Sequence, residues 1–399
     1  MTSTDYSLGY KTSSLIYLLF VFATLSMLNS GAFSTSLIFG ALLLILSFKN
    51  FRFFLVPRGI SMLLLIFILI CYISLLTTVV PFGEQHKIRI IQVFYWFLLA
   101  IFIFNSYDYI DKEKLSKVVF LTVLIYLLIN LRYRLVLRNE VAFTVIIMGP
   151  LGFLFSPKYI FRMLYALAIV TLMIFLGSRA GAIICFSQII LFFILFAPKL
   201  NRHAKHLTIL LMIIAFSVNL TPVRNTLGRF ITPMNERVGS FLLNPGEVYL
   251  NDISWLQRRA QIQKGFQIFK EHPLLGIGIF NFQEYKVDID ISGINNSRGT
   301  IRNINSRSSH NVYISLLSET GILGLSVVVV MFLLILLNLF VNFNKIAGTF
   351  EAAVFISLIG MLVYFYFISS FFGTSSWLLY GLCLGASDHV SRARKLEIS

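Results

Sequence analysis

The chain has 399 residues, of which 57% are hydrophobic and only 13% are charged. Soluble domains carry about 25% charged residues, so this composition excludes an ordinary soluble domain. The net charge of +16 would suit a nucleic-acid-binding protein, but in membrane proteins an excess of Lys and Arg usually marks cytoplasmic loops. The positions of the charges along the chain decide between these two explanations.

Apolar runs that are long enough to cross roughly 30 Å of hydrocarbon as helices recur along the chain. They predict an all-α polytopic membrane protein with about 12 transmembrane helices. The period-two alternation of membrane strands is absent, which argues against a barrel. The predicted spans are residues 14–30, 31–47, 59–80, 88–105, 116–131, 140–156, 159–176, 180–197, 205–220, 321–341, 348–371 and 374–388.

The distribution of Lys and Arg predicts that both termini lie in the cytoplasm. With the N-terminus inside, the short cytoplasmic segments hold 16 of these residues and the short outer loops hold 6. This asymmetry agrees with the excess of basic residues in cytoplasmic loops. Topology therefore explains the basic charge, and we expect no nucleic-acid partner.

A long polar interval divides the chain into three parts. We expect residues 1–220 to form transmembrane helices 1–9 and residues 221–311 to form a subdomain on the outer face of the membrane. Residues 312–399 are expected to form transmembrane helices 10–12 and a cytoplasmic tail. The chemistry of the protein is expected in the polar interval, because the spans are almost purely apolar.

Two amphipathic helices are predicted around this interval. The first begins near Ser254, whose spacing from Gln257 matches a capping box. One face of this helix carries the apolar residues Trp255, Ile262, Phe266 and Phe269. Pro273 ends it. The second begins near Ser309, and its buried residues are expected to be Tyr313, Leu316 and Leu317.

Arginines on the outer side are candidate anion-binding residues. Arg179 lies between two apolar spans in the small-residue sequence GSRAG, and a charge at a membrane edge is a functional candidate by default. The neighbouring Ser178 and the outer-loop Arg138 are candidate binding residues. Arg258 and Arg259 open the first amphipathic helix, and periodicity alone does not separate them. A guanidinium binds phosphate oxygens in a bidentate manner.

His310 is the candidate proton acceptor, because imidazole titrates near neutrality. It precedes a membrane span and has polar neighbours, including Asn311, which is a further candidate binding residue. Glu319 is a candidate supporting group. Asp288 and Asp290 match no metal-binding loop, and neither a metal nor another cofactor is expected. The three cysteines, Cys71, Cys185 and Cys383, are expected to be buried and unpaired.

Several motifs together resemble the bacterial O-antigen ligase and O-antigen polymerase superfamily. These motifs are GSRAG, an Arg-led helix that runs into HPLLGIG with a following NF, and SHN with ETGILG after the loop. The resemblance extends over about residues 179–325. It implies a multi-span GT-C-type glycosyltransferase with a large periplasmic loop in the bacterial inner membrane.

The resemblance also implies a mechanism. The donor would be a glycan on undecaprenyl diphosphate, and transfer would be inverting and metal-independent. Arg179 and Arg258 match the family's diphosphate-binding arginines, and His310 matches its catalytic histidine. Arg258 is favoured over Arg259 because it stands 14 positions before the His-Pro pair. We expect Arg179, Arg258 and His310 to converge on one cavity at the membrane surface.

The resemblance leaves the acceptor open. A polymerase, which the form of the two longer motifs favours, would extend a glycan repeat unit. A ligase would transfer the glycan to lipid A–core. A flippase for lipid-linked glycans is a lower-ranked alternative, since transporters place ionisable groups near the bilayer midplane. A flippase and a chain-length regulator are expected as further partners of a transferase, along with membrane lipid.

Overall fold

The computed structural model describes residues 14, 16–21, 23–24, 59–78, 80, 84–133, 138–176, 178–196, 221–233, 236–247, 253–287, 308–369 and 371–398. All regular structure in these ranges is helical, and they contain no strand. The predicted all-α class is therefore confirmed for this part of the chain. The predicted spans at 31–47 and 205–220 lie outside the described residues.

Most of the apolar helices lie at predicted spans, although the span at 140–156 is divided in two and the last helix extends ten residues beyond the span at 374–388. In the first half they are α3 (Ser61–Leu76), α4 (Glu84–Ser106), η3 (Tyr107–Tyr109), α5 (Lys112–Tyr133), α6 (Arg138–Met148), η4 (Pro150–Phe155), α7 (Tyr159–Leu176) and α8 (Arg179–Phe196). In the second half they are α10 (Thr221–Ile231), α11 (Glu236–Leu243), α13 (Ile253–Glu271), α14 (Val312–Val341), α15 (Phe343–Ile346), α16 (Phe350–Tyr364) and α17 (Thr374–Ile398).

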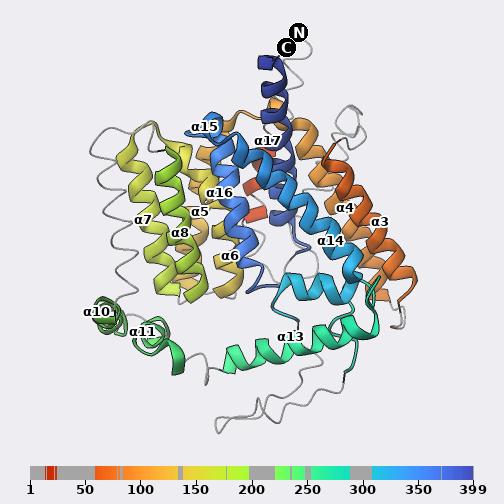
Figure 1. Ribbon diagram of the computed structural model, residues 1–399. Helices are drawn as coiled ribbons and strands as arrows, with labels where there is room; N and C mark the ends of the chain where they lie inside the picture. The colour runs from red at the N-terminus through yellow and green to blue at the C-terminus, as the bar shows by residue number, and fades with distance from the viewer. Residues whose placement is uncertain are drawn as a thin grey trace.

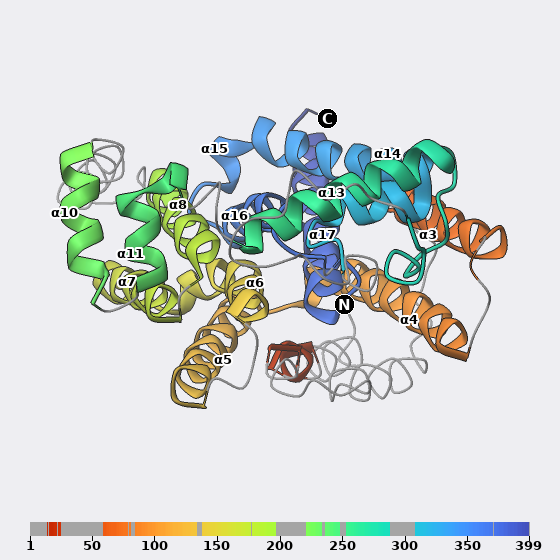
Figure 2. The ribbon, with the colours of Figure 1, turned by 90° about the horizontal axis from the view of Figure 1, so that it is seen from below.

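The apolar helices form a bundle in which α17 packs against α4, α14 and α16 (Figures 1 and 2). The core around α17 is aromatic. Trp377 is fully buried, and its ring lies 5.4 Å from Tyr380 and 6.0 Å from Phe372. Cys71, Cys185 and Cys383 are buried and free, as expected from their apolar surroundings.

Apolar side chains also cover the outside of the bundle. Leu69 on α3, Leu128 on α5 and Leu333 on α14 are each more than half exposed. Exposed apolar surface of this extent marks a contact with lipid or protein. Among the described residues, three helices are long and apolar enough to cross a membrane, at Arg89–Tyr109, Lys112–Tyr133 and Val312–Val341, and five are shorter apolar helices. The protein is a helical membrane protein, and the total of 12 spans stays a prediction.

The helices of the polar interval gather at one end of the bundle. In Figure 1, α10, α11 and α13 lie at the lower end, opposite α15 and the C-terminal end of α17. The sequence predicted α13 and the start of α14 but missed α10 and α11. Val223, Leu227 and Phe230 of α10 are spaced by four and three residues, which is the period of an amphipathic helix.

The predicted apolar face of α13 was wrong for Phe266, which is 48% exposed. The buried row is instead Leu256, Ala260, Lys264 and Ile268. This row is buried because the chain after the helix folds back against it. Ile268 packs with Ile277, Phe282, Val287 and Ile314 in a small separate core. The side of α13 that is buried is therefore determined by the chain segment that packs against it, and not by the number of apolar residues on each face.

The second predicted helix is the first part of a longer one. It begins at Val312, three residues after the predicted start, and continues to Val341 with a break at Gly321, where φ is 64° and ψ is −167°. In Figure 1 the part before the break runs across the lower end of the bundle near α13, and the part after it runs up the bundle. The break therefore divides α14 into two parts that run in different directions.

Candidate active site

Arg258 lies on the second turn of α13, where aromatic rings hold it. Its guanidinium carbon is 5.7 Å from the centre of the Trp255 ring and 5.5 Å from that of Phe367. Its Nη2 donates a hydrogen bond to the Phe367 carbonyl oxygen at 3.5 Å. Cation–π contacts of this kind position a guanidinium while leaving donors for an anion. Arg258 is thus fixed against the segment that follows α16.

Arg259 differs from its neighbour. It is exposed, whereas Arg258 is half-buried. Successive helical residues point about 100° apart, so the packing that holds one arginine leaves the other in solvent. The structure thereby separates two residues that periodicity left equivalent, although the role of each stays a prediction.

The GSRAG segment begins α8. Arg179 is the first residue of the helix, and its side chain lies outside the described residues. The buried Ser178 hydroxyl accepts a hydrogen bond from the Gly181 amide at 3.2 Å, which is a helix N-cap. A Cβ on Gly181 would come within 2.6 Å of the Ala142 Cβ. At Gly181 the missing side chain thus permits close packing of α8 on α6.

Tyr364, at the end of α16, joins these two regions. Its hydroxyl donates to the Asn139 carbonyl oxygen at 3.0 Å. Its ring lies 6.0 Å from that of Phe367, which holds Arg258, and α16 packs against α8. The start of α8, which carries Arg179, and the start of α13, which carries Arg258, are therefore both close to one end of α16.

His310 occupies a turn just before α14. Its φ of 48° lies in the left-handed region, where non-glycine residues are uncommon. The turn is fastened to α16, because the Val312 amide donates to the Phe365 carbonyl oxygen at 2.8 Å and the Tyr313 hydroxyl donates to that of Leu362 at 2.6 Å. Phe365 is two residues from Phe367, which holds Arg258. His310 and Arg258 are thus positioned by the same short segment.

Asn311 and Arg138 were also predicted to bind substrate. Asn311 is buried, and its side chain accepts a hydrogen bond from the Ile314 amide at 3.1 Å, which caps α14. Arg138 is the first residue of α6, and its side chain lies outside the described residues. Binding of substrate by either residue stays a prediction.

The two longest sequence motifs are two halves of one structural unit. The HPLLGIG turn donates from Ile277 to the Ser318 carbonyl oxygen and from Gly278 to that of Glu319, both at 3.0 Å. The Ile322 amide donates in return to the Pro273 carbonyl oxygen at 2.9 Å. These bonds use backbone groups that the break in α14 releases, since buried peptide groups need partners. The turn after α13 is thereby locked into the break of α14.

Helix α3 supports this lock from the other side. The Ser74 hydroxyl lies 2.6 Å from the carbonyl oxygens of both Leu275 and Glu319. The Thr78 hydroxyl donates to the Ile277 carbonyl oxygen at 2.5 Å and accepts from the Asn281 amide at 2.8 Å. The asparagine of the NF pair after HPLLGIG thus fixes the end of the turn to the residues that directly follow α3.

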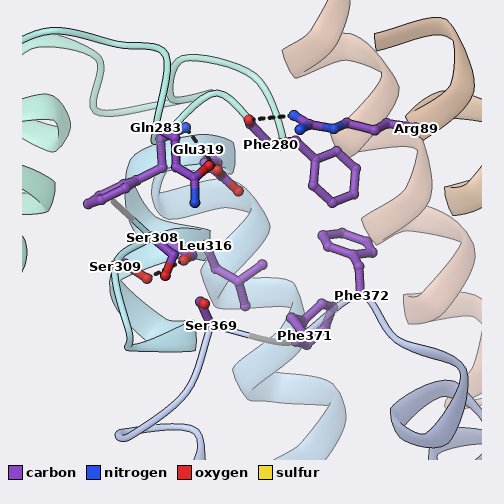
Figure 3. Close-up of a pocket in the computed structure, with 12 residues that line it drawn as sticks. Arg89, Phe280, Gln283, Ser308, Ser309, Leu316, Glu319, Ser369, Phe371 and Phe372 are labelled. Atoms are coloured by element: carbon purple, nitrogen blue, oxygen red, sulfur yellow. Dashed lines mark hydrogen bonds between the residues drawn. The ribbon is translucent and has the colours of Figure 1, made fainter. Parts of the chain in front are cut away.

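A cavity of about 250 Å³ opens beside the His310 turn (Figure 3). Its wall combines serine hydroxyls and an amide with aromatic rings and one buried carboxylate. The lining residues are Arg89, Phe280, Phe282, Gln283, Ser308, Ser309, Ser315, Leu316, Glu319, Ser369, Phe371 and Phe372. They come from α4, the turn after α13, the start of α14 and the segment after α16. His310 directly follows two of them.

Sequence reasoning missed Arg89 and gave Glu319 another role. The Arg89 Nη1 donates to the Phe280 carbonyl oxygen at 2.9 Å. Glu319 accepts from the Phe282 amide at 3.0 Å, and its charge is attracted by Arg89 and Lys264. Its bonds hold the cavity wall, whereas the sequence had suggested support for His310. A signal for Arg89 existed, since it is one of the few basic residues expected outside.

Lys264 is a second cation behind this wall. Its side chain is buried, with Nζ 4.8 Å from the centre of the Phe282 ring. Burial lowers the pKa of its ammonium group to about 8, against the attraction of Glu284 and Glu319. Within the described ranges, no three His, Cys, Asp or Glu side chains are grouped so that they could hold a metal ion. Asp288 and Asp290 lie outside those ranges, and metal independence stays a prediction.

The fold and the site define a helical membrane protein whose polar groups converge at one end of the bundle. The family model described as O-antigen ligase matches residues 164–329. The resemblance to the O-antigen ligase and polymerase superfamily is thus confirmed. The match includes Arg179, Arg258 and His310 but covers less than half of the chain, and α3, α4 and α16 lie outside it. No curated protein matches the chain.

Proposed function

We propose that the protein transfers a glycan from undecaprenyl diphosphate to an acceptor hydroxyl at the periplasmic face of the inner membrane. The observation that carries the proposal is the meeting of three segments at the end of α16. These are the start of α8 with Arg179, the start of α13 with Arg258 and the turn of His310. The family match over all three segments supports the same activity.

In this reaction the acceptor hydroxyl oxygen attacks the anomeric carbon of the donor sugar. The bond from that carbon to the diphosphate oxygen breaks, and its electron pair leaves with undecaprenyl diphosphate. The hydroxyl proton passes to His310. Attack from the face opposite the leaving group inverts the anomeric configuration, and no metal ion takes part in the proposed step.

Arg179 and Arg258 would bind the diphosphate and stabilise its growing charge. A guanidinium keeps its charge at any working pH and binds phosphate oxygens in a bidentate manner. Removal of one preorganised donor typically costs about 3–4 kcal/mol of transition-state stabilisation. The rings of Trp255 and Phe367 hold Arg258 before substrate arrives, so little reorganisation is needed.

The acceptor separates two forms of this activity. A polymerase would transfer the growing chain to another lipid-linked repeat unit, which the form of the HPLLGIG and HNVYISLLSETGILG motifs favours. A ligase would transfer it to lipid A–core, and the description of the matched family favours this form.

The test is transfer by the purified full-length protein in phospholipid nanodiscs, with lipid-linked oligosaccharide extracted from the host and lipid A–core as separate acceptors. We expect a new glycosidic product and the release of undecaprenyl diphosphate. The variants Arg179→Ala, Arg258→Ala and His310→Ala should each abolish product while inserting normally. Full activity of the His310→Ala variant would refute the mechanism, and movement of donor across vesicles without product would favour a flippase.

A further inference from the structure

The cavity beside His310 has the chemistry of a sugar-binding site. Serine hydroxyls and the Gln283 amide both donate and accept hydrogen bonds, and the Glu319 carboxylate accepts them. Sugar hydroxyls need this mixture. The Phe280, Phe371 and Phe372 rings supply apolar surface against which the C–H faces of a sugar ring can pack. Figure 3 shows these rings on one side of the cavity and the serines on the other.

The charges of the cavity disfavour an anion. Glu319 is only 7% exposed and lines the wall, so a diphosphate in the cavity would lie against a buried acidic side chain, which offers it no positive charge. Arg89 is already directed to the Phe280 carbonyl oxygen, with its guanidinium 5.3 Å from the Phe280 ring centre. Apart from Arg89 and Glu319, the lining consists of serine hydroxyls, one amide and apolar side chains, which suit uncharged hydroxyls.

The size and the rigidity of the cavity point the same way. Its volume of about 250 Å³ is below the ~300–1,000 Å³ of pockets for drug-sized ligands, so it suits a single sugar ring. The Phe372 ring lies 6.0 Å from Trp377 and 5.9 Å from Trp96. This aromatic wall is backed by the bundle core, and its shape is therefore set before a ligand binds.

The position of the cavity connects it to the proposed reaction. Ser308 and Ser309 line it and directly precede His310, while Ser369 lies two residues after Phe367, which holds Arg258. The short segment from Phe367 to Ser369 therefore contacts Arg258 of the proposed diphosphate site at one end and lines the cavity at the other. A sugar in the cavity would present a hydroxyl beside the His310 turn.

We propose that this cavity binds the terminal sugar of the acceptor glycan, with Gln283, Ser308 and Ser369 as its hydrogen-bonding groups. This inference rests on the proposed glycosyl transfer and adds the acceptor subsite to it. The shared chemistry is a neutral polyhydroxyl ring, which either a glycan repeat unit or a core oligosaccharide can supply.

The test is binding of free oligosaccharide to the purified full-length protein. Two probes are used, namely the repeat-unit oligosaccharide released by mild acid from the host's lipid-linked intermediates and the core oligosaccharide released from its lipid A–core. Calorimetric titration measures each Kd, and tryptophan fluorescence, to which Trp96, Trp255 and Trp377 all contribute, gives a second binding signal. We expect one probe to bind. The repeat unit would mark a polymerase, and the core oligosaccharide would mark a ligase.

Variants of the wall locate the bound sugar. Ser308→Leu and Ser369→Leu fill the cavity and should each raise the Kd at least tenfold. Gln283→Ala removes one exposed hydrogen-bonding group without disturbing packing and should raise it about threefold to tenfold. The control is Ser240→Leu on α11, a half-buried serine away from the cavity, which should bind like the wild type. Inorganic pyrophosphate should not compete with the probe.

The outcomes separate this inference from the proposed transfer. If a probe binds through the cavity but no donor yields a glycosidic product, the transfer is wrong and the sugar site stands. If product forms while Ser308→Leu, Ser369→Leu and Gln283→Ala bind like the wild type, the sugar site is overturned and the transfer stands. Binding of neither probe, or displacement by pyrophosphate, also overturns the sugar site.

Discussion

Gly321 of α14 lies directly against the backbone carbonyl of Leu274 in the HPLLGIG turn, so that no side-chain atom fits between them. Its φ of 64° and ψ of −167° belong to a region that is essentially restricted to glycine. The conformation and the contact have one cause. The break in α14 allows the HPLLGIG turn to dock against it. Only glycine permits both the backbone conformation at this position and the close contact with Leu274.

We therefore predict that Gly321→Ala strongly destabilises the protein. Backbone strain of this kind costs about 1–3 kcal/mol, and displacement of Leu274 adds to it. The measurement is the thermal unfolding midpoint in detergent. Gly246→Ala is the matched control, because a Cβ there would meet no atom within 4 Å. Equal midpoints for the two variants would contradict the docking role of Gly321.

Arg258 and Arg259 offer an internal comparison for the anion site. Arg258→Ala should lower kcat for glycan transfer by about 100-fold or more, as expected for loss of one preorganised donor. Arg259→Ala, one residue away on the exposed side, should keep nearly wild-type transfer. Arg258→Lys keeps the charge but loses the bidentate geometry, and should fall between them. Purified transfer assays at saturating donor measure all three, and a larger loss in Arg259→Ala would reverse the assignment.

The turn of His310 allows chemistry and conformation to be separated. Asn tolerates the left-handed region far better than Ala, so His310→Asn should fold like the wild type. His310→Ala should be less stable than His310→Asn by about 1 kcal/mol. Both should lose transfer, because neither side chain accepts a proton near neutral pH. Thermal midpoints and product formation are measured together, and substantial transfer by His310→Asn would exclude His310 as the base.

Lys264 predicts a rise of stability with pH. Its folded pKa of about 8 is below its ordinary value of 10.5, so between these values the unfolded chain binds more protons than the folded one. The free energy of unfolding then increases with pH, by up to about 3 kcal/mol across the window. Below pH 8 both states are protonated and this group adds no pH dependence.

The Lys264→Met variant should lose this rise. Its unfolding midpoint, followed from pH 7 to pH 10, should change less than that of the wild type. Lys270→Met, at an exposed position of the same helix, should behave like the wild type. A Lys264→Met curve parallel to the wild-type curve would show that the ammonium group is solvated in the folded protein.

The helices of the bundle were predictable because hydrophobic length alone decides them. The predicted spans at 59–80 and 159–176 match α3 and α7 to within a few residues. The same rule could not find the break at Gly321, since an apolar sequence runs through it. What breaks the helix is a backbone partner, the HPLLGIG turn, which is distant in sequence.

The candidate site divides in a similar way. Arg258 and His310 were candidates from the sequence alone, because a guanidinium binds phosphate and imidazole titrates near neutrality, and the family resemblance favoured Arg258 over Arg259. Their shared anchor at the end of α16 was not, since Phe365 and Phe367 act through backbone carbonyl oxygens, which every residue possesses. The sequence does not distinguish Arg89 and Glu319 from other charged residues. Their shared position in the cavity wall is visible only in the fold, where α4 lies against the turn after α13.

The break at Gly321 also fixes a depth. The part of α14 from Gly321 to Val341 would span roughly 30 Å at 1.5 Å per residue, which is the thickness of the hydrocarbon layer. We therefore expect the part before it to lie at the lipid headgroups, together with the locked end of α13. In the proposed reaction, membrane thickness would then set the height at which His310 and Arg258 meet the lipid-linked donor, and a bilayer of longer acyl chains would move both residues relative to its diphosphate.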